Sequence, residues 1–396
     1  MNGIDAPQNW RFVHVAFVVA VFGWGIGFYG VSVYLPALHD LHGWSISTIS
    51  AAITAHYLVS ALLIAGLPEA YRRFGVRRVT TAGAVLTAAG ALAWANVQAP
   101  WQLLPALVLS GAGWSAMSGA ALNAMVAPWF ERDRPKAMSF AFNGASVGGL
   151  LFVPLWAALI ATLGLPWSAA IMAVAAVVIV CPLAWHFLRY PARAVPVSHT
   201  PPAAPSTRRA LLSQPAFVTI SVAFALGLFA QIGLVAHLIV RLEPIFGKGL
   251  AALAISLITL CAILGRSLLA QLIGDHDRRI VAAANLLIQA MGTVLLVLGD
   301  GPAVLLVGCV LFGLGFGNLT SLPPLIAQHE FQAADVGTVV ALVTAINQAV
   351  FAFAPGVFGV LRDLTDSYST AFLIAATAQV AAAAIVARGH AATRAG

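Results

Sequence analysis

The feature that most limits how this chain can fold is a series of twelve long apolar runs, each about 20 residues or longer. A run of this length crosses the hydrocarbon core of a bilayer as one helix, and a helix satisfies its own backbone polar groups there. Only 8% of the residues are charged and 61% are hydrophobic, whereas a soluble domain has about 25% charged residues. The sequence therefore predicts an all-α integral membrane protein with twelve transmembrane helices. The runs cover residues 12–38, 46–70, 78–98, 102–127, 137–162, 166–188, 215–241, 250–273, 280–299, 302–327, 336–361 and 368–387.

The runs form two sets of six, separated by residues 189–214, a stretch rich in Pro, Ala and Ser that is typical of a flexible linker. Three patterns of the first set recur in the second after 201, 202 and 201 residues. They are Arg77-Arg78 with Arg278-Arg279, Gly111-Ala-Gly113-Trp114 with Gly313-Leu-Gly315-Phe316, and Pro154 with Pro355. We therefore predict two pseudo-symmetric six-helix bundles, residues 1–188 and 215–396, joined by a cytoplasmic linker, residues 189–214.

The distribution of lysine and arginine predicts the orientation of the helices. With both termini in the cytoplasm, sixteen of the twenty basic residues lie in cytoplasmic segments. Arg241, Lys248 and Arg362 lie on the opposite side, and Arg266 lies inside an apolar run. Such an excess of basic residues is the usual mark of cytoplasmic loops. We expect a multi-pass protein of the cell inner (cytoplasmic) membrane, and we attribute the formal charge of +7 to topology rather than to nucleic-acid binding.

Arg266 is the charged residue whose position most needs an explanation. It lies eight residues before Gly274, where the following loop begins, and thus roughly 12 Å inside the helix end. A guanidinium keeps its proton and costs roughly 2.5 kcal/mol or more at that depth. All thirteen acidic residues fall at the ends of apolar runs or between them. The leading interpretation is that Arg266 binds an anionic substrate. The alternative is a structural arginine that donates to helix carbonyls or reaches a water-filled cavity.

Four polar side chains in other runs are further candidates for the substrate site. Tyr29 lies near the middle of the first run, where its hydroxyl can donate to a carboxylate. Asn143 and Asn347 carry amides into the fifth and eleventh runs, and an amide in hydrocarbon needs a partner. Either a substrate or a neighbouring helix can supply that partner. Tyr57 in the second run has the same two interpretations, cavity lining or packing.

Two histidines are candidates for proton coupling, because histidine changes its charge in the physiological pH range. His56 lies in the second run, and His237 lies in the seventh run, one turn before Arg241. A neutral histidine packed among apolar side chains is the alternative interpretation for both.

Glycine-rich and basic motifs recur at defined places along the chain. They are Phe22-Gly-Trp-Gly25, Gly43-Trp-Ser45, Arg73-Phe-Gly-Val-Arg-Arg78, Trp129-Phe130-Glu-Arg132-Asp-Arg134, Gly144-Ala-Ser-Val-Gly148, and Gly265-Arg266 followed by Asp275 and Arg278-Arg279. Together these motifs resemble the major facilitator superfamily over nearly the whole chain. Those of the N-terminal half are most similar to the branch that holds monocarboxylate transporters and oxalate/formate exchangers. The resemblance implies the major facilitator fold and transport by alternating access.

The resemblance also implies that two cytoplasmic loops gate transport. The first loop departs from the family pattern, because Arg72 stands where relatives carry an acidic residue and Pro68 where they carry a glycine. Glu69 or Asp133 can substitute for the missing acidic residue. The gating residues at matching positions are Arg73, Gly75, Arg77 and Arg78 in the first loop, and Asp275 and Arg278 in the second.

We therefore expect a secondary active transporter that moves a small organic anion, a monocarboxylate, by proton symport or anion exchange. A single mid-membrane cation suits a monoanion better than a dianion. Phe22 and Ala262 stand where many monocarboxylate transporters carry an aspartate. The alternative function is efflux of drugs or other lipophilic compounds, with Arg266 as a structural residue. A membrane sensor without transport activity is a third hypothesis, although the sequence shows no sizeable soluble domain.

The sequence contains no pattern typical of an enzyme or a metal site. A phosphate-binding loop, HExxH and GxSxG are not found. Cys181, Cys261 and Cys309 lie far apart in apolar runs, as buried small side chains do. We expect no enzyme activity, no cofactor and no metal. We expect a functional monomer in the lipid bilayer, whose partners are the small organic anion and protons.

Overall fold

The computed structural model describes residues 5–130, 133–188, 208–273 and 276–394, and the secondary structure of these residues is entirely helical. Ten helices within this part of the chain are long and apolar enough to cross a membrane. One of them, Lys136–Phe187, contains two segments that meet at Gly164, and residues 76–95 form a further helical segment. The described residues thus provide twelve segments of spanning length. This number agrees with the twelve apolar runs of the sequence.

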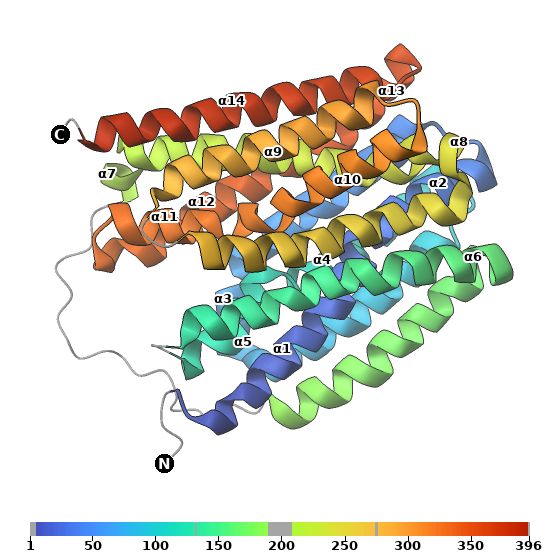
Figure 1. The fold of residues 1–396 in the computed structure, drawn as a ribbon. Coiled ribbons are helices and arrows are strands. Elements are labelled where there is room, and N and C mark those ends of the chain that lie inside the picture. The colour runs from blue at the N-terminus through green and yellow to red at the C-terminus, as the bar shows by residue number, and fades with distance from the viewer. Residues whose placement is uncertain (1–4, 131–132, 189–207, 274–275, 395–396) are drawn as a thin grey trace. The chain divides into compact units, whose positions relative to one another are not determined.

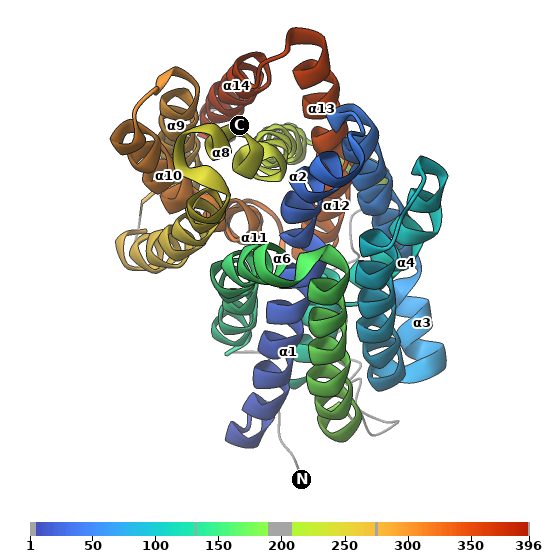
Figure 2. The same ribbon diagram turned by 90° about the vertical axis from the view of Figure 1, so that its right-hand side faces the viewer.

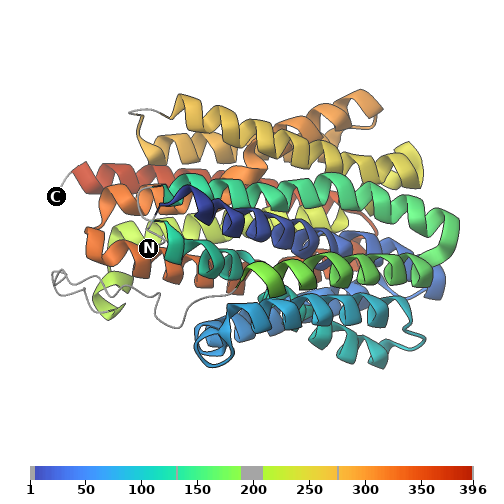
Figure 3. The same ribbon diagram turned by 90° about the horizontal axis from the view of Figure 1, so that it is seen from below.

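The contacts within the chain divide it into two compact units. Unit 1 comprises Met1–Val197 and Gly247–Ser256, and unit 2 comprises Ser198–Phe246 and Leu257–Gly396. Within each unit the long helices run alongside one another (Figure 3). The elements up to Phe187 are η1 (Pro7–Asn9), α1 (Trp10–Phe22), the π-helix η2 (Gly23–Phe28), α2 (Gly30–His42), α3 (Ile46–Ala95), η3 (Pro100–Gln102), α4 (Leu103–Ser115), α5 (Gly119–Val126), η4 (Ala127–Trp129) and α6 (Arg134–Phe187). Those that follow are α7 (Arg208–Leu212), α8 (Pro215–Leu272), α9 (Arg278–Leu298), α10 (Pro302–Phe316), η5 (Gly317–Thr320), α11 (Leu322–Glu330), α12 (Ala333–Phe351), α13 (Ala354–Thr365) and α14 (Ser369–Arg394).

Three glycines join pairs of spanning segments into α3, α6 and α8. Gly75, Gly164 and Gly247 have φ of 79°, 78° and 74°, with ψ of 151°, 166° and 165°. This region of φ and ψ is open essentially to glycine alone. One residue therefore turns the chain between two long helices. Gly75 belongs to the predicted first gating loop, and its backbone conformation is a sufficient reason for glycine there.

Replacing Gly75 by alanine is expected to destabilise the protein by about 1–3 kcal/mol, because alanine at this φ and ψ is strained. The space around a Cβ is open, so backbone strain is the whole effect. Gly66→Ala, in the same α3, is the matched control, since its Cβ also meets open space and its φ is not positive. Thermal unfolding of the purified proteins in detergent measures the difference. Equal unfolding temperatures for the two variants would contradict the assigned strain.

Several spanning segments are interrupted at places that the apolar runs did not predict. In the first spanning segment, the π-helix η2 separates α1 from α2. The eleventh spanning segment is broken between α12 and α13. The fourth and tenth segments break after Ser115 and Phe316, which are 201 residues apart. This distance is the same as that between the repeated arginine pairs of the sequence. Hydropathy does not register such breaks, because a helix and its interruption can be equally apolar.

Each unit has its own buried core. In unit 1, Phe12, Tyr57, Trp94 and Trp156 are at most 1% exposed and come from α1, α3 and α6, which Figure 2 shows with α4. In unit 2 the core joins α8, α9, η5, α11, α12 and α14. There α9 packs between α10 and α14 (Figure 1). The position of α9 matters for the site described next.

Candidate functional site

Arg266 lies in the second part of α8, within unit 2, and its side chain is half-buried. Its Nη2 donates a hydrogen bond of 3.1 Å to the carbonyl oxygen of Gly317. Gly317 is the first residue of η5, where α10 has just ended, so its carbonyl belongs to an interrupted helix. A Cβ on Gly317 would lie 2.8 Å from Nη2 of Arg266, so glycine allows this close approach. The hydrogen bond agrees with one of the two interpretations from the sequence, an arginine that donates to a helix carbonyl.

Small residues explain how α8 comes close enough to α10 for this bond. A Cβ on Gly265 would overlap the carbonyl oxygen of Leu314 in α10. A Cβ on Gly313 would lie 2.8 Å from the Cβ of Cys261 and 2.8 Å from the carbonyl oxygen of Ile258, both in α8. Glycine on both sides of a crossing lets two helix backbones approach closely. The crossing therefore depends on Gly265 of α8 as much as on Gly313 of α10.

Buried amides surround the break in the tenth segment, and the sequence analysis did not single them out. Asn285 and Gln289 of α9 both donate to the carbonyl of Gly315, and Gln231 of α8 donates to that of Phe316. Asn318 of η5 donates to the carbonyl of Leu314 and to Oδ1 of Asn285. We call Gln231, Asn285, Gln289 and Asn318 the amide cluster. A sequence signal was present, since Asn285, Gln289 and Thr293 follow one another at four-residue intervals on an apolar helix.

The two asparagines predicted for the substrate site belong to different units. Asn143 is half-buried on α6 in unit 1. Asn347 is 5% exposed on α12 in unit 2, and its Oδ1 accepts no hydrogen bond from the described residues. A buried amide oxygen of this kind has capacity for a donor. Asn347 therefore shares unit 2 with Arg266, whereas Asn143 shares unit 1 with the two tyrosines.

Tyr29 and Tyr57 come together around Phe28 at the end of the π-helix. The ring of Phe28 lies 4.9 Å from that of Tyr29 and 6.0 Å from that of Tyr57 between centroids. The hydroxyl of Tyr57 donates to the carbonyl of Phe28 over 3.5 Å. Trp114 of α4 adds two more contacts, with Phe28 at 5.9 Å and with Trp24 at 4.7 Å. These residues form an aromatic cluster in unit 1.

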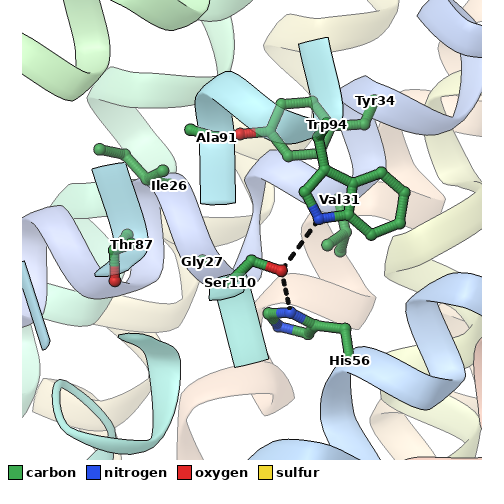
Figure 4. Close-up of a pocket in the computed structure, with 9 residues that line it drawn as sticks. All are labelled: Ile26, Gly27, Val31, Tyr34, His56, Thr87, Ala91, Trp94 and Ser110. Carbon is green, nitrogen blue, oxygen red and sulfur yellow. Dashed lines mark hydrogen bonds between the residues drawn. The ribbon is translucent and has the colours of Figure 1, made fainter. Parts of the chain in front are cut away.

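His56 is completely buried in a small cavity of unit 1 (Figure 4). Its Nδ1 shares a hydrogen bond of 2.8 Å with Oγ of Ser110, and that oxygen also accepts a hydrogen bond of 2.9 Å from Nε1 of Trp94. The ring of Tyr34 stacks on Trp94 with 5.9 Å between the ring centroids. His56 is therefore one member of a hydrogen-bonded cluster that links α3 with α4.

His237 is also completely buried, in unit 2. Its Nε2 donates to the carbonyl of Pro355 over 3.0 Å, which requires a proton on that nitrogen. Its ring packs against Phe358 and Tyr368, with 6.2 Å and 5.5 Å between centroids. Both histidines thus have the packing that the alternative interpretation described, and proton coupling through them stays a prediction.

In the first predicted gating loop, aromatic rings contact two of the basic residues. The guanidinium of Arg77 lies 3.5 Å from the centre of the Trp185 ring, a cation–π distance that ties α3 to α6. Arg73 lies over the neighbouring ring of Phe74, and Arg78 is exposed. Glu69 forms an exposed ion pair with Arg72, three residues later in α3.

At the second predicted gating loop, Arg279 is deeply buried, whereas the predicted gating residue is its neighbour Arg278. Asp275 lies outside the described residues, and Arg278 donates to the carbonyl of His276 over 2.6 Å. Arg279 is 1% exposed and binds both carboxylate oxygens of Glu330, Nε at 2.6 Å and Nη2 at 2.7 Å. Its remaining bonds go to Oγ1 of Thr219 and to the carbonyls of Ala216 and Val386. This one side chain therefore connects α8, α9, α11 and α14.

Comparison with known proteins adds independent information. The sequence model of the family described as "Major Facilitator Superfamily" matches residues 13–355 of this chain. The curated protein "MFS-type transporter 1" of Ophiocordyceps sp. (strain BCC 1869) is 28% identical over 324 residues, which make up 78% of this chain and 68% of that protein. Among solved structures, the nucleoside transporter NupG superposes with a TM-score of 0.71 at 13% identity, and a mutant of it with 0.75 at 12%. These two matches cover 97% and 96% of this chain and 99% of each NupG chain, and at such identity they concern the fold alone.

Proposed function

This chain belongs to the major facilitator superfamily of membrane transporters, and from that premise we propose that it carries a small organic anion, a monocarboxylate, across the inner membrane. The family and the helical structure confirm the predicted fold class. The proposed transport is secondary and works by alternating access, as proton symport or anion exchange. In this proposal the bundles of residues 1–188 and 215–396 move about the linker 189–214. The protein acts as a monomer with both termini in the cytoplasm.

The observation that carries the proposal is the position of Arg266. It holds a permanent positive charge within an apolar spanning segment, and it is half-buried rather than sealed in the core. One of its donors, Nη2, bonds the carbonyl of Gly317. A guanidinium presents five donors in a planar fork that matches a carboxylate, and an ion pair there is stronger than a bond to a carbonyl. A carboxylate substrate is therefore the anion that this side chain suits best.

We assign supporting roles to the other predicted residues. Asn347, whose buried Oδ1 accepts no hydrogen bond from the described residues, contributes a polar contact on the side of unit 2. Tyr29, Tyr57 and Asn143 contribute from unit 1. Proton coupling is proposed for His56 and His237, and gating for the two cytoplasmic loops.

Counterflow in proteoliposomes tests the proposal. Vesicles are loaded with unlabelled acetate, lactate or pyruvate, and the entry of labelled pyruvate is followed. Arg266→Gln is expected to lower the transport efficiency about 10- to 100-fold, because a charge-assisted hydrogen bond contributes about 1.5–3 kcal/mol. Arg241→Gln is the matched control, since Arg241 also donates to a backbone carbonyl, that of Gly299 just after α9, and lies near the end of a span. Unchanged counterflow in Arg266→Gln would remove the role assigned to Arg266.

The aromatic cluster of unit 1 favours a second candidate, a ring-bearing or lipophilic solute. Trp24 is its half-buried member and contacts the buried ring of Trp114, which in turn contacts that of Phe28. Aromatic faces bind rings by stacking, without need of a charge. Labelled uridine and a lipophilic dye therefore belong in the same counterflow experiment. Their transport without any transport of carboxylates would favour this second candidate.

A further inference from the structure

The break in the tenth segment leaves three successive carbonyls that face side chains of other helices. The carbonyl of Gly315 accepts from Asn285 at 3.2 Å and from Gln289 at 3.0 Å. The carbonyl of Phe316 accepts from Gln231 at 3.1 Å, and that of Gly317 accepts from Arg266, also at 3.1 Å. An ideal helix would use these carbonyls for its own amides four residues later. Here Asn285, Gln289, Gln231 and Arg266 add side-chain donors to the local ones, which include the backbone N–H of Gly317 at the carbonyl of Gly315 and Oγ1 of Thr320 at that of Gly317.

The two donors from α9 are buried and closely fitted. Gln289 is not exposed at all and Asn285 is 7% exposed. A Cβ on Gly315 would overlap the side chain of Gln289, so the amide reaches its carbonyl only because residue 315 is glycine. About one turn after Gln289, Gly292 of α9 lies against the backbone of Phe312 in α10, where a Cβ would overlap the Phe312 amide nitrogen. The backbone of α10 near its break therefore has little freedom to shift along α9.

The carbonyl that accepts the hydrogen bond from Arg266 lies just beyond this closely packed part of α10. Gly317 is two residues beyond Gly315, and its carbonyl is bonded to the guanidinium. The carbonyl of Gly315 also accepts from the backbone N–H of Gly317, which couples the two residues directly. Loss of either side-chain donor removes a hydrogen bond from this buried carbonyl, which is unfavourable. The chain then relaxes at the break, and Gly317 moves with it. Arg266 keeps its charge, but its hydrogen bond to the carbonyl of Gly317 is displaced.

We propose that Asn285 and Gln289 of α9 are positioning residues that hold Arg266 in its binding geometry through the Gly315–Gly317 backbone. The inference rests on the proposed function, because it takes Arg266 as the residue that meets the carboxylate. It adds a positioning role for α9, a helix without an assigned role in the proposed function.

The experiment compares Gln289→Met with Gln379→Met. Gln379 of α14 is equally buried and accepts a hydrogen bond from Thr293, one turn after Gln289 on α9, but its described bonds do not reach the break. Both variants replace a buried amide by an unbranched side chain of similar size. Three quantities are measured: KM and maximal rate for labelled pyruvate in proteoliposomes, thermal unfolding in detergent, and the rate at which phenylglyoxal modifies Arg266, read by mass spectrometry.

We expect Gln289→Met to raise KM about 3- to 10-fold, with maximal rate changed by less than about twofold, and to change the phenylglyoxal rate at Arg266 by a similar factor. Gln379→Met is expected to leave both KM and the phenylglyoxal rate within about twofold of the native values. In the Arg266→Gln background, Gln289→Met should add no further change in KM, because both act through one contact.

Each contrary result has a defined meaning. If Gln289→Met and Gln379→Met change KM and the Arg266 modification rate equally, the positioning role is wrong, although the proposed function stands. If Arg266→Gln leaves pyruvate transport unchanged, the proposed function fails, and the inference fails with it. The modification rate of Arg266 still reports in that case whether the amides control the position of the guanidinium.

Discussion

Replacing Glu330 by glutamine is expected to destabilise the protein by about 3–5 kcal/mol, because it leaves the buried guanidinium of Arg279 without a counter-charge. The side chains of Arg279 and Glu330 are 1% and 11% exposed, so water provides little screening. The two-pronged contact places both carboxylate oxygens within 2.7 Å of guanidinium nitrogens. Glutamine keeps the shape of the side chain but supplies only one acceptor and no charge. Thermal or denaturant unfolding in detergent measures the loss.

Two variants make this prediction specific. Asp366→Asn removes the charge from the exposed pair with Arg362, in which Asp366 is 94% exposed, and is expected to cost at most about 1 kcal/mol. The double variant Arg279→Met/Glu330→Met removes both buried charges and should recover much of the stability lost in Glu330→Gln. Equal losses for Glu330→Gln and Asp366→Asn would show that the buried pair has no special weight.

The second large effect is expected at the crossing of α8 and α10. Gly265→Ala should destabilise the protein by about 3 kcal/mol or more, because the added Cβ would overlap the backbone carbonyl of Leu314 rather than a flexible side chain. The two helices must separate to accommodate it. Separation also moves Arg266, the next residue, away from Gly317, so transport of pyruvate should fall together with stability.

Gly249→Ala provides the comparison on the same helix. A Cβ there meets open space, and alanine is up to about 1 kcal/mol better than glycine inside a helix. The unfolding temperature of Gly249→Ala should therefore equal or exceed the native value, whereas that of Gly265→Ala should be clearly lower. A Gly265→Ala protein as stable as the native one would mean that α8 and α10 do not cross as closely as described.

Arg266 and Arg279 illustrate what could be predicted from the sequence and what could not. An arginine in an apolar run is easily recognised in the sequence. Its charge requires a polar or charged partner there, because an unpaired charge inside the membrane is costly. Its acceptor is not predictable in this way, because Gly317 is 51 residues distant and offers a carbonyl only where α10 is broken. The pair Arg278-Arg279 was equally visible, but the sequence does not indicate which of the two enters the core. Its partner Glu330 is again 51 residues away.

The sequence by itself determined the helical class and the number of spanning segments, and it predicted their separation into two sets of six. These properties depend on the length and periodicity of apolar runs, which are local and act one segment at a time. Only the tertiary structure decided that Asn285 and Gln289 meet the carbonyls of a broken α10 and that Gly265 lies against Leu314. Such contacts arise from the packing of helices far apart in the chain. A buried polar group takes whichever partner the packing brings within hydrogen-bond distance.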